Sequence, residues 1–164
     1  VNLSIRQFNK IDFNQKLMKQ LEENNLQAHC LCLEIKEDLL VENNPVAMDR
    51  LNALNSIGIK ISLDDFGTGY SSLIYLQSFP VNMIKIDRCL IQNINQNAKN
   101  SIITQAVINL AHQLNLSVVA EGVETQEEFE YLQKLNCDII QGYFFCSPLP
   151  FADFFKFLQN MNNV

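Results

Sequence analysis

Two adjacent aspartates, Asp64 and Asp65, carry the clearest chemical signal in this chain of 164 residues. An alternating apolar run with Ile59, Ile61 and Leu63 leads directly into them, which is typical of a half-buried strand. The glycines and small hydroxyl residues that follow are typical of a tight loop. Neighbouring carboxylates at a strand end repel each other unless a cation or a proton lies between them. The pattern therefore predicts a divalent-metal site and directs the search to further ligands.

Polar or charged residues also stand at the carboxyl ends of the other strands that the sequence predicts. The expected strands cover Val1–Leu3, Cys30–Ile35, Ile59–Leu63, Met83–Ile86, Ser117–Ala120 and Ile139–Phe145. In the same order, the residues at their ends are Asn2, Glu34, Asp64 with Asp65, Lys85 with Asp87, Glu121 and Gln141. Because the carboxyl ends of parallel strands meet on one side of a sheet, one site could collect all of these side chains.

Amphipathic segments between these strands are expected to be helices. Residues 102–114 follow helical spacing, and Thr125 with Glu128 forms a capping box. Pro45 suits a first helical turn, and Gly58 suits a helix end. Alternating strands and helices predict a parallel α/β sheet. An open sheet gathers ligand groups at its switch point, whereas a (β/α)8 TIM-type barrel brings every strand end to one mouth, so polar residues at all six ends favour the barrel.

The length of the chain indicates an incomplete barrel. A barrel of this type has eight strands and about 250 residues, so 164 residues with six expected strands are about two strand–helix units short. The chain also begins at Val1 without a methionine, and we expect residues 1–164 to be one partial domain of a longer protein. No leader or apolar run of membrane-spanning length is present, which favours the cytoplasm and leaves open a membrane tether upstream of Val1.

Composition excludes several classes of function. A formal net charge of −6 and a pI near 4.8, without a stripe of Lys or Arg, argue against binding to polymeric nucleic acid. A small anionic ligand stays compatible if metal ions lie between it and the carboxylates. The five cysteines lack paired CxxC spacing, so buried free thiols in a reducing compartment are expected rather than disulfides or zinc. They are Cys30, Cys32, Cys89, Cys137 and Cys146.

The strand-end residues form an oxygen-rich set of potential ligands. Hard oxygen donors without His or Cys suit Mg²⁺ or Mn²⁺ rather than zinc, and two such ions can clamp a phosphodiester for in-line attack by a hydroxide. Lys85 adds a cation or a proton-transfer group, and Gln141 could orient a water or a phosphate oxygen. Acidic residues after strands can also merely cap the next helix, but this explains six consecutive strand ends poorly. The oxygen ligands are Glu34, Asp64, Asp65 and Glu121, with the carbonyl of Asn2.

Six segments resemble the motifs of the EAL domain family, the bacterial cyclic di-GMP phosphodiesterases. They are VNLSIRQF at Val1, LEIKE at Leu33, DDFGTGYSS at Asp64, KIDR at Lys85, VVAEGVET at Val118 and QGYFF at Gln141. Their order and spacing are similar to the carboxyl-terminal two-thirds of an EAL domain. The resemblance implies hydrolysis of cyclic di-GMP to linear pGpG with two Mg²⁺ or Mn²⁺ ions, in second-messenger signalling. It also implies a homodimer formed through this domain and leaves open a fused sensory or cyclase domain.

The resemblance further assigns roles to single residues. It implies that Asn2, Glu34 and Asp64 ligate the first metal ion and that Asp65 helps to hold the second. Lys85 would assist the attacking water, Glu121 would support the metal and water, and Gln141 would orient that water. Glu37 matches a glutamate that steadies the loop after Asp65, while Asp87 and Glu124 match positions near the site. In relatives this loop couples metal binding to dimer contacts; here it comprises Phe66, Gly67, Thr68, Gly69, Tyr70, Ser71 and Ser72.

Two departures from the family pattern bear on activity. The Glu-Ala-Leu motif that names the family lies on a strand before that of Asn2 and is absent here. Its glutamate is a metal ligand, so the chain by itself is expected to be inactive. The second departure is Lys36, where relatives usually carry threonine. A long cation beside the metal ligands is harmless if it points outward and otherwise alters the geometry of the following loop.

Two other functions fit parts of the pattern. The first is an EAL module that binds cyclic di-GMP or a protein without catalysis, which need not retain both metal sites. The second is a Mg²⁺-dependent barrel enzyme that abstracts a proton beside a carboxylate with Lys85 as base, which would not explain the adjacent aspartates. The glycines at Gly67 and Gly69 lack the lysine of a phosphate-binding P-loop. His29 and His112 stand away from the strand ends and are expected to be structural or exposed.

Overall fold

Five parallel strands of the described part of the chain form one sheet, in the order of the sequence. The computed structural model describes residues 1–36, 45–67, 76 and 78–161. The strands are β1 (Cys32–Lys36), β2 (Lys60–Phe66), β3 (Met83–Ile86), β4 (Ser117–Ala120) and β5 (Ile139–Ile140). Asn2 lies outside these strands and forms a parallel bridge with Glu34 of β1. The bridge consists of hydrogen bonds from Leu3 N to Glu34 O and from Glu34 N to Val1 O. The described strands therefore follow the parallel α/β order expected of a barrel, but their sheet does not close on itself.

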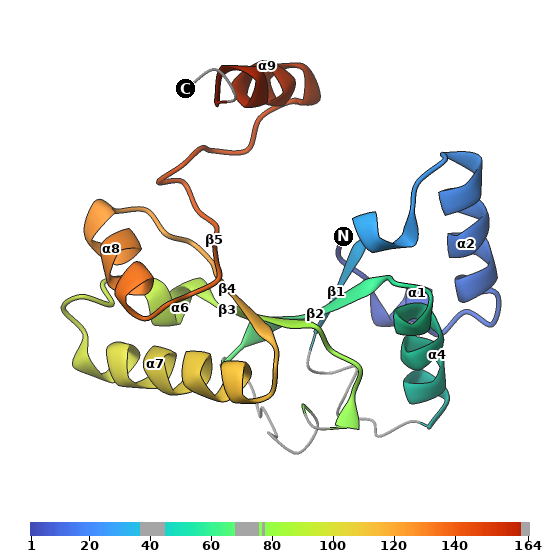
Figure 1. Ribbon diagram of the computed structural model, residues 1–164, viewed down its shortest axis with the longest axis horizontal. Coiled ribbons are helices and arrows are strands. Elements are labelled where there is room, and N and C mark those ends of the chain that lie inside the picture. The colour runs from blue at the N-terminus through green and yellow to red at the C-terminus, as the bar shows by residue number, and fades with distance from the viewer. Residues whose placement is uncertain (37–44, 68–75, 77, 162–164) are drawn as a thin grey trace.

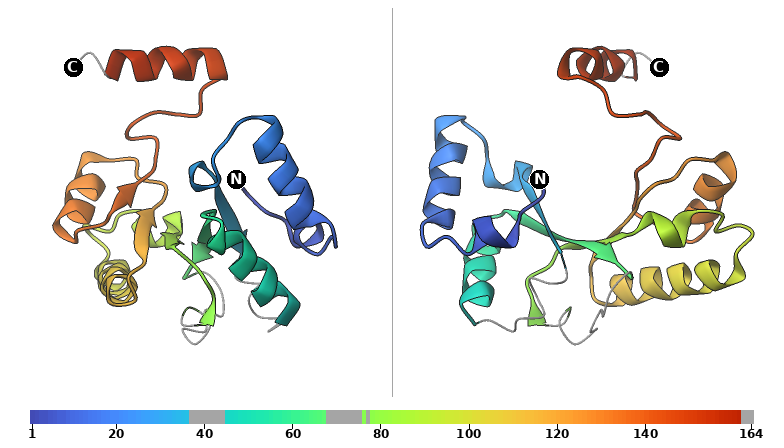
Figure 2. Two further views of the ribbon diagram at one scale, coloured as in Figure 1. Left: turned by 45° about the vertical axis from the view of Figure 1, so that its right-hand side comes forward. Right: turned by 180° about the vertical axis from the view of Figure 1, so that it is seen from behind.

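Most helices lie between successive strands along the chain and cover the sheet. They are α1 (Ile5–Phe8), α2 (Phe13–Glu23), the 3₁₀ turn η1 (Ala28–Cys30), α4 (Pro45–Ser56), α6 (Arg88–Ile91), α7 (Ala98–Gln113), α8 (Gln126–Lys134) and α9 (Phe151–Met161). Figure 1 shows α2 and α4 beside β1 and β2, and α6, α7 and α8 around β3 to β5. The further views in Figure 2 show α9 standing apart from the sheet at the end of an extended segment. No helix among the described residues is long and apolar enough to span a bilayer.

Most expected elements are confirmed. Strands β3 and β4 have the predicted bounds, Pro45 is the first residue of α4, and Gly58 follows that helix with a φ of 96°. Thr125 and Glu128 form the capping box that opens α8. Glu34, Ser62, Asp64 and Lys85 lie on one face of the sheet, whereas the other face is apolar and packs against the helices. Buried side chains there include Ile35, Ile61, Leu63, Ile84, Ile86, Val118, Leu51, Leu54, Ile108 and Ala111.

Three expectations are wrong: the bounds of the first and the last expected strand, and the burial of the cysteines. The strand expected at Val1–Leu3 is reduced to the bridge at Asn2. The strand expected over Ile139–Phe145 ends at Ile140, because the backbone then turns back to Val123, whose N–H donates to the carbonyl of Gln141. The cysteines are free, but none is buried: Cys30 lies on the 3₁₀ turn and Cys89 in the first turn of α6, both facing solvent, while Cys32, Cys137 and Cys146 are partly exposed.

Glu128 ties α8 to the loops on the site side of the sheet. Its side chain is 4% exposed and accepts hydrogen bonds from three backbone N–H groups, those of Asn93 at 2.9 Å, Glu124 at 2.9 Å and Thr125 at 3.2 Å. One carboxylate thus completes the capping box and fixes the segment that follows α6. The same residue holds the turn that begins at Glu121, so its role reaches the carboxyl end of β4.

We expect Glu128→Ala to lower the free energy of unfolding by about 2 kcal/mol, because it leaves three N–H groups without their acceptor. Glu127→Ala is the matched control, since Glu127 is an exposed glutamate in the same helical turn. Urea denaturation followed by circular dichroism measures both changes. Equal loss of stability in the two variants would contradict this role of Glu128.

Candidate metal and phosphodiester site

Lys85 lies at the centre of a group of carboxylates on the carboxyl side of the sheet. It stands on β3, the middle strand, and its side chain is 8% exposed. Its Nζ contacts Glu34 Oε2 at 3.0 Å, Asp64 Oδ1 at 3.1 Å and Glu121 Oε1 at 2.7 Å. These acidic residues belong to β1, to β2 and to the segment directly after β4. Four of the predicted strand-end residues therefore converge, namely Glu34, Asp64, Lys85 and Glu121.

The charges within this group shift the pKa values of its members. Burial lowers the pKa of Lys85, but hydrogen bonds to Glu121, Glu34 and Asp64 outweigh burial and raise it well above the usual value. Burial raises the pKa of Glu121; Lys85 opposes this rise, and the charges of Asp64 and Glu34 add to it. The metal-free site is thus a protonated amine surrounded by carboxylates that repel one another.

A backbone irregularity turns both aspartates of β2 toward the same site. Successive side chains on a regular strand point to opposite faces, so Asp64 and Asp65 would normally diverge. The register between β2 and β3 shifts between Leu63 and Phe66, and Asp65 has a left-handed φ of 56°. A bulge of this kind redirects one side chain, and a left-handed conformation is uncommon for a residue other than glycine. The strand is distorted where the two carboxylates must face one site.

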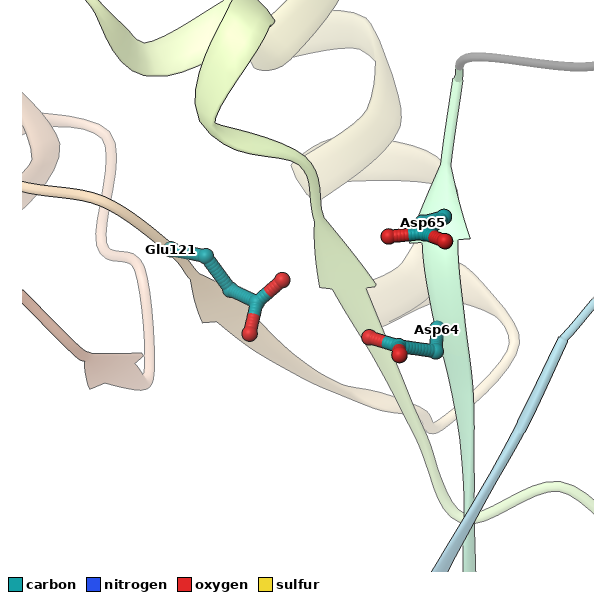
Figure 3. Close-up of side chains that lie close together, drawn as sticks. All are labelled: Asp64, Asp65 and Glu121. Atoms are coloured by element: carbon teal, nitrogen blue, oxygen red, sulfur yellow. The ribbon is translucent and has the colours of Figure 1, made fainter. Parts of the chain in front are cut away.

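Three carboxylates lie close enough to share a metal ion. Ligand oxygens of Asp64, Asp65 and Glu121 all lie within 4.8 Å of one another, and Figure 3 shows the three side chains pointing into the same space from β2 and from the end of β4. Oxygen donors of this type suit Mg²⁺, Mn²⁺ or Ca²⁺. The residues present therefore fit a hard divalent cation, and Glu34 joins them through its contact with Lys85.

Two cavities flank the carboxylates and contain the outer predicted residues. One of about 740 Å³ is lined by Asn2, Arg6, Glu34, Lys36 and Asp64, among others. The other, of about 250 Å³, is lined by Asp87, Arg88, Glu121, Gly122, Glu124, Gln141, Gly142 and Tyr143. Asn2 and Gln141 are thus brought to opposite sides of the site, beside its ligands. An anionic ligand that spans the carboxylates would reach both cavities.

Asp87 has a different role from the other acidic residues. Its side chain accepts a hydrogen bond from Cys89 N at 2.8 Å and caps α6. Burial raises the pKa of Asp87, but this hydrogen bond and the charge of Arg88 outweigh burial and lower it. For this residue the helix-capping interpretation is right, although the side chain also lines the smaller cavity.

Lys36, the second departure from the family pattern, contacts one of the predicted metal ligands. Its Nζ lies 2.6 Å from Asp65 Oδ2. The pairing of β1 with β2 places Lys36 opposite Asp64, which explains how a residue 29 positions away reaches Asp65. Strand register is set by tertiary packing and cannot be read from the sequence. The sequence indicated only that Lys36 stands close to Glu34, one of the predicted ligands.

Several predicted loop residues lie outside the described part of the chain. Glu37 and the segment Thr68 to Ser72 (Thr68, Gly69, Tyr70, Ser71, Ser72) belong to ranges 37–44 and 68–75. Of the predicted coupling loop, Phe66 is the buried last residue of β2. Gly67 follows with a φ of 96°, and a Cβ at that position would lie 2.7 Å from the side chain of Leu90. The start of the loop therefore requires glycine for both conformation and space.

Comparison with known proteins identifies the family. The family model described as EAL domain matches residues 1–148. The chain belongs to the EAL domain family. Among its relatives, the cyclic di-GMP phosphodiesterase NbdA of Pseudomonas aeruginosa is 39% identical over 159 residues, which are 97% of this chain and 20% of NbdA. The chain thus spans about a fifth of the length of this curated relative.

Solved EAL structures have the same fold as this domain. The PaMucR phosphodiesterase in complex with c-di-GMP matches with a TM-score of 0.88 and 36% identity, over 94% of this chain and 62% of that one. BlrP1 of Klebsiella pneumoniae, in a complex with manganese and cy-diGMP, matches with a TM-score of 0.81 and 33% identity, over 90% of this chain and 38% of that one. The parallel α/β architecture expected from the sequence is therefore that of the EAL fold, present here with an incomplete barrel.

We expect Lys85→Met to destabilise the metal-free domain by about 2–3 kcal/mol, because it removes the cation that separates three carboxylates. Adding Glu121→Gln to this variant should restore part of the loss, since one of the repelling charges is then absent. Lys60→Met, an exposed lysine at the other end of β2, is the control. The measurement is urea denaturation in the presence of EDTA, and a stability of Lys85→Met equal to that of Lys60→Met would refute the argument.

Proposed function

We propose that this domain, in a closed barrel, hydrolyses cyclic di-GMP to linear pGpG with two divalent metal ions. The observation that carries the proposal is the convergence of Asp64, Asp65 and Glu121, with ligand oxygens within 4.8 Å of one another and Lys85 in contact with two of them. Membership of the EAL family and the names of its relatives supply the substrate. Adjacent carboxylates on a distorted strand repel each other, which supports a role in binding cations.

The proposed metal ligands are the strand-end oxygens. Asn2, Glu34 and Asp64 would hold one ion, Asp65 would help to hold the other, and Glu121 would support both. When bound, such ions supply an activated water and neutralise phosphate charge. Mg²⁺ and Mn²⁺ are the proposed ions, and the manganese complex of BlrP1 is consistent with this choice.

Two further residues are proposed to act on the attacking water and the substrate. Lys85 would donate a hydrogen bond to a water or a phosphate oxygen in place of one of its three carboxylate partners. Gln141 lines the adjoining cavity with Glu121 and would orient the water from the other side.

The remaining implications of the resemblance stay predictions. These are a homodimer, a cytoplasmic location, and coupling of metal binding to the dimer through Glu37 and the loop after Asp65. A non-catalytic module that binds cyclic di-GMP is the second candidate. It is compatible with the ion pairs of Lys85 and Lys36, which neutralise part of the charge of four carboxylates.

We expect the 164-residue chain alone to show no turnover, because its sheet leaves the barrel open between Asn2 and β5. The same chain placed behind the first two strand–helix units of the PaMucR phosphodiesterase should hydrolyse cyclic di-GMP with Mg²⁺ or Mn²⁺. Chromatographic detection of pGpG measures both. Turnover by the chain alone would disprove the predicted inactivity.

Within the active chimera, Asp64→Asn should reduce hydrolysis at least 100-fold, since it removes a proposed metal ligand and a neighbour of Lys85. Asp153→Asn, an exposed aspartate on α9, is the matched control and should retain activity. A chimera that binds cyclic di-GMP with Mn²⁺ but forms no pGpG would reject hydrolysis in favour of the binding module.

A further inference from the structure

Lys36 forms an ion pair with one of the proposed metal ligands. It is the last residue of β1, its side chain is 63% exposed, and its Nζ lies 2.6 Å from Asp65 Oδ2. We propose that Lys36 competes with divalent metal for Asp65 and thereby lowers the metal affinity of this site. The inference rests on the proposed function, because it assumes that Asp65 is a metal ligand.

The charges around the site explain the direction of the effect. Among the described residues, four carboxylates contact a lysine ammonium at the site: Glu34, Asp64 and Glu121 contact Lys85, and Asp65 contacts Lys36. Four negative and two positive charges leave a formal charge of −2 without metal. A site without the Lys36 charge would be more negative and would attract a doubly charged ion more strongly.

The two lysines differ in how easily they leave their partners. Lys85 is 8% exposed and touches three carboxylates, so three partners hold its amine at once. Lys36 is mostly exposed, and exposed ion pairs are weak because water competes for both charges. An arriving ion can therefore displace Lys36 from Asp65, and the lysine can then extend into solvent.

The backbone of Asp65 limits how the carboxylate can satisfy both partners. Its left-handed φ of 56° follows the shift in strand register, so the direction of the side chain is set by the strand. One carboxylate oxygen contacts Lys36 on the β1 side, while an oxygen of the same side chain lies within 4.8 Å of ligand oxygens of Asp64 and Glu121. Lys36 and a metal ion therefore draw on the same carboxylate from two directions.

A purely structural role for Lys36 predicts the opposite result. If the lysine only oriented Asp65 for the metal, its removal would weaken metal binding. Competition predicts that the metal ion binds more tightly once the charge of Lys36 is removed. The expected gain is about fivefold, which corresponds to the repulsion between a single and a double positive charge roughly 8 Å apart in water. The sign of the change in metal affinity separates the two roles.

The test is titration with Mn²⁺ of the chimera in which the chain follows the first two strand–helix units of the PaMucR phosphodiesterase, with free Mn²⁺ measured by electron paramagnetic resonance. Lys36→Met should bind Mn²⁺ about fivefold more tightly than the unmodified chimera, and Lys36→Gln should behave in the same way. Lys36→Arg keeps the charge and should match the unmodified chimera. Lys60→Met loses the same charge at the opposite end of β2 and should also change little. Unfolding in EDTA confirms that each variant is folded.

The outcomes separate this inference from the proposed function. Mn²⁺ binding by all variants with equal or weaker affinity in Lys36→Met would overturn the competition and leave the metal site standing. Binding by Lys36→Met alone would support the competition in its strongest form. Absence of Mn²⁺ binding in every variant, Lys36→Met included, would overturn the metal site and this inference together.

Discussion

Repulsion among carboxylates at the carboxyl ends of the strands is the constraint on which the rest of this structure depends. Glu34, Asp64 and Glu121 come from three different parts of the sheet and meet around one amine, that of Lys85 on the central strand. An unpaired buried charge is costly, whereas a charge with partners on all sides is tolerated. The position of Lys85 in the middle of the strand order therefore allows the acidic residues to coexist before any metal is bound.

The backbone carries a second part of this arrangement. A regular β2 would send Asp64 and Asp65 to opposite faces of the sheet, and the shift in register with the left-handed Asp65 keeps them together. Such conformations persist where surrounding structure enforces them, and they gather at functional sites. Here the apolar strands on both sides supply the rigidity, since Leu63 and Ile84 are buried and paired directly across β2 and β3.

Much of this site was predictable because local patterns and strand ends are readable from sequence. Alternating apolar residues located β3 and β4, and the polar residue at the end of each run indicated which edge of the sheet carries the site. The capping box at Thr125 and the expected start of α4 at Pro45 were confirmed for the same reason, since each depends on neighbours only a few residues away. Convergence of four strand ends follows from parallel topology, which the alternation of helices and strands already indicated.

What the amino-acid order could establish, then, was which polar residues share one edge of the sheet, because this depends on residue type and local spacing. The partners of these residues depended on three-dimensional packing. Register across β1 and β2 brings Lys36 to Asp65, a hydrogen bond to Cys89 makes Asp87 a helix cap, and a turn toward Val123 ends β5 early. Each is a contact between backbone or side-chain atoms whose distance is set by how strands and loops pack, and such distances are not encoded in spacing along the chain.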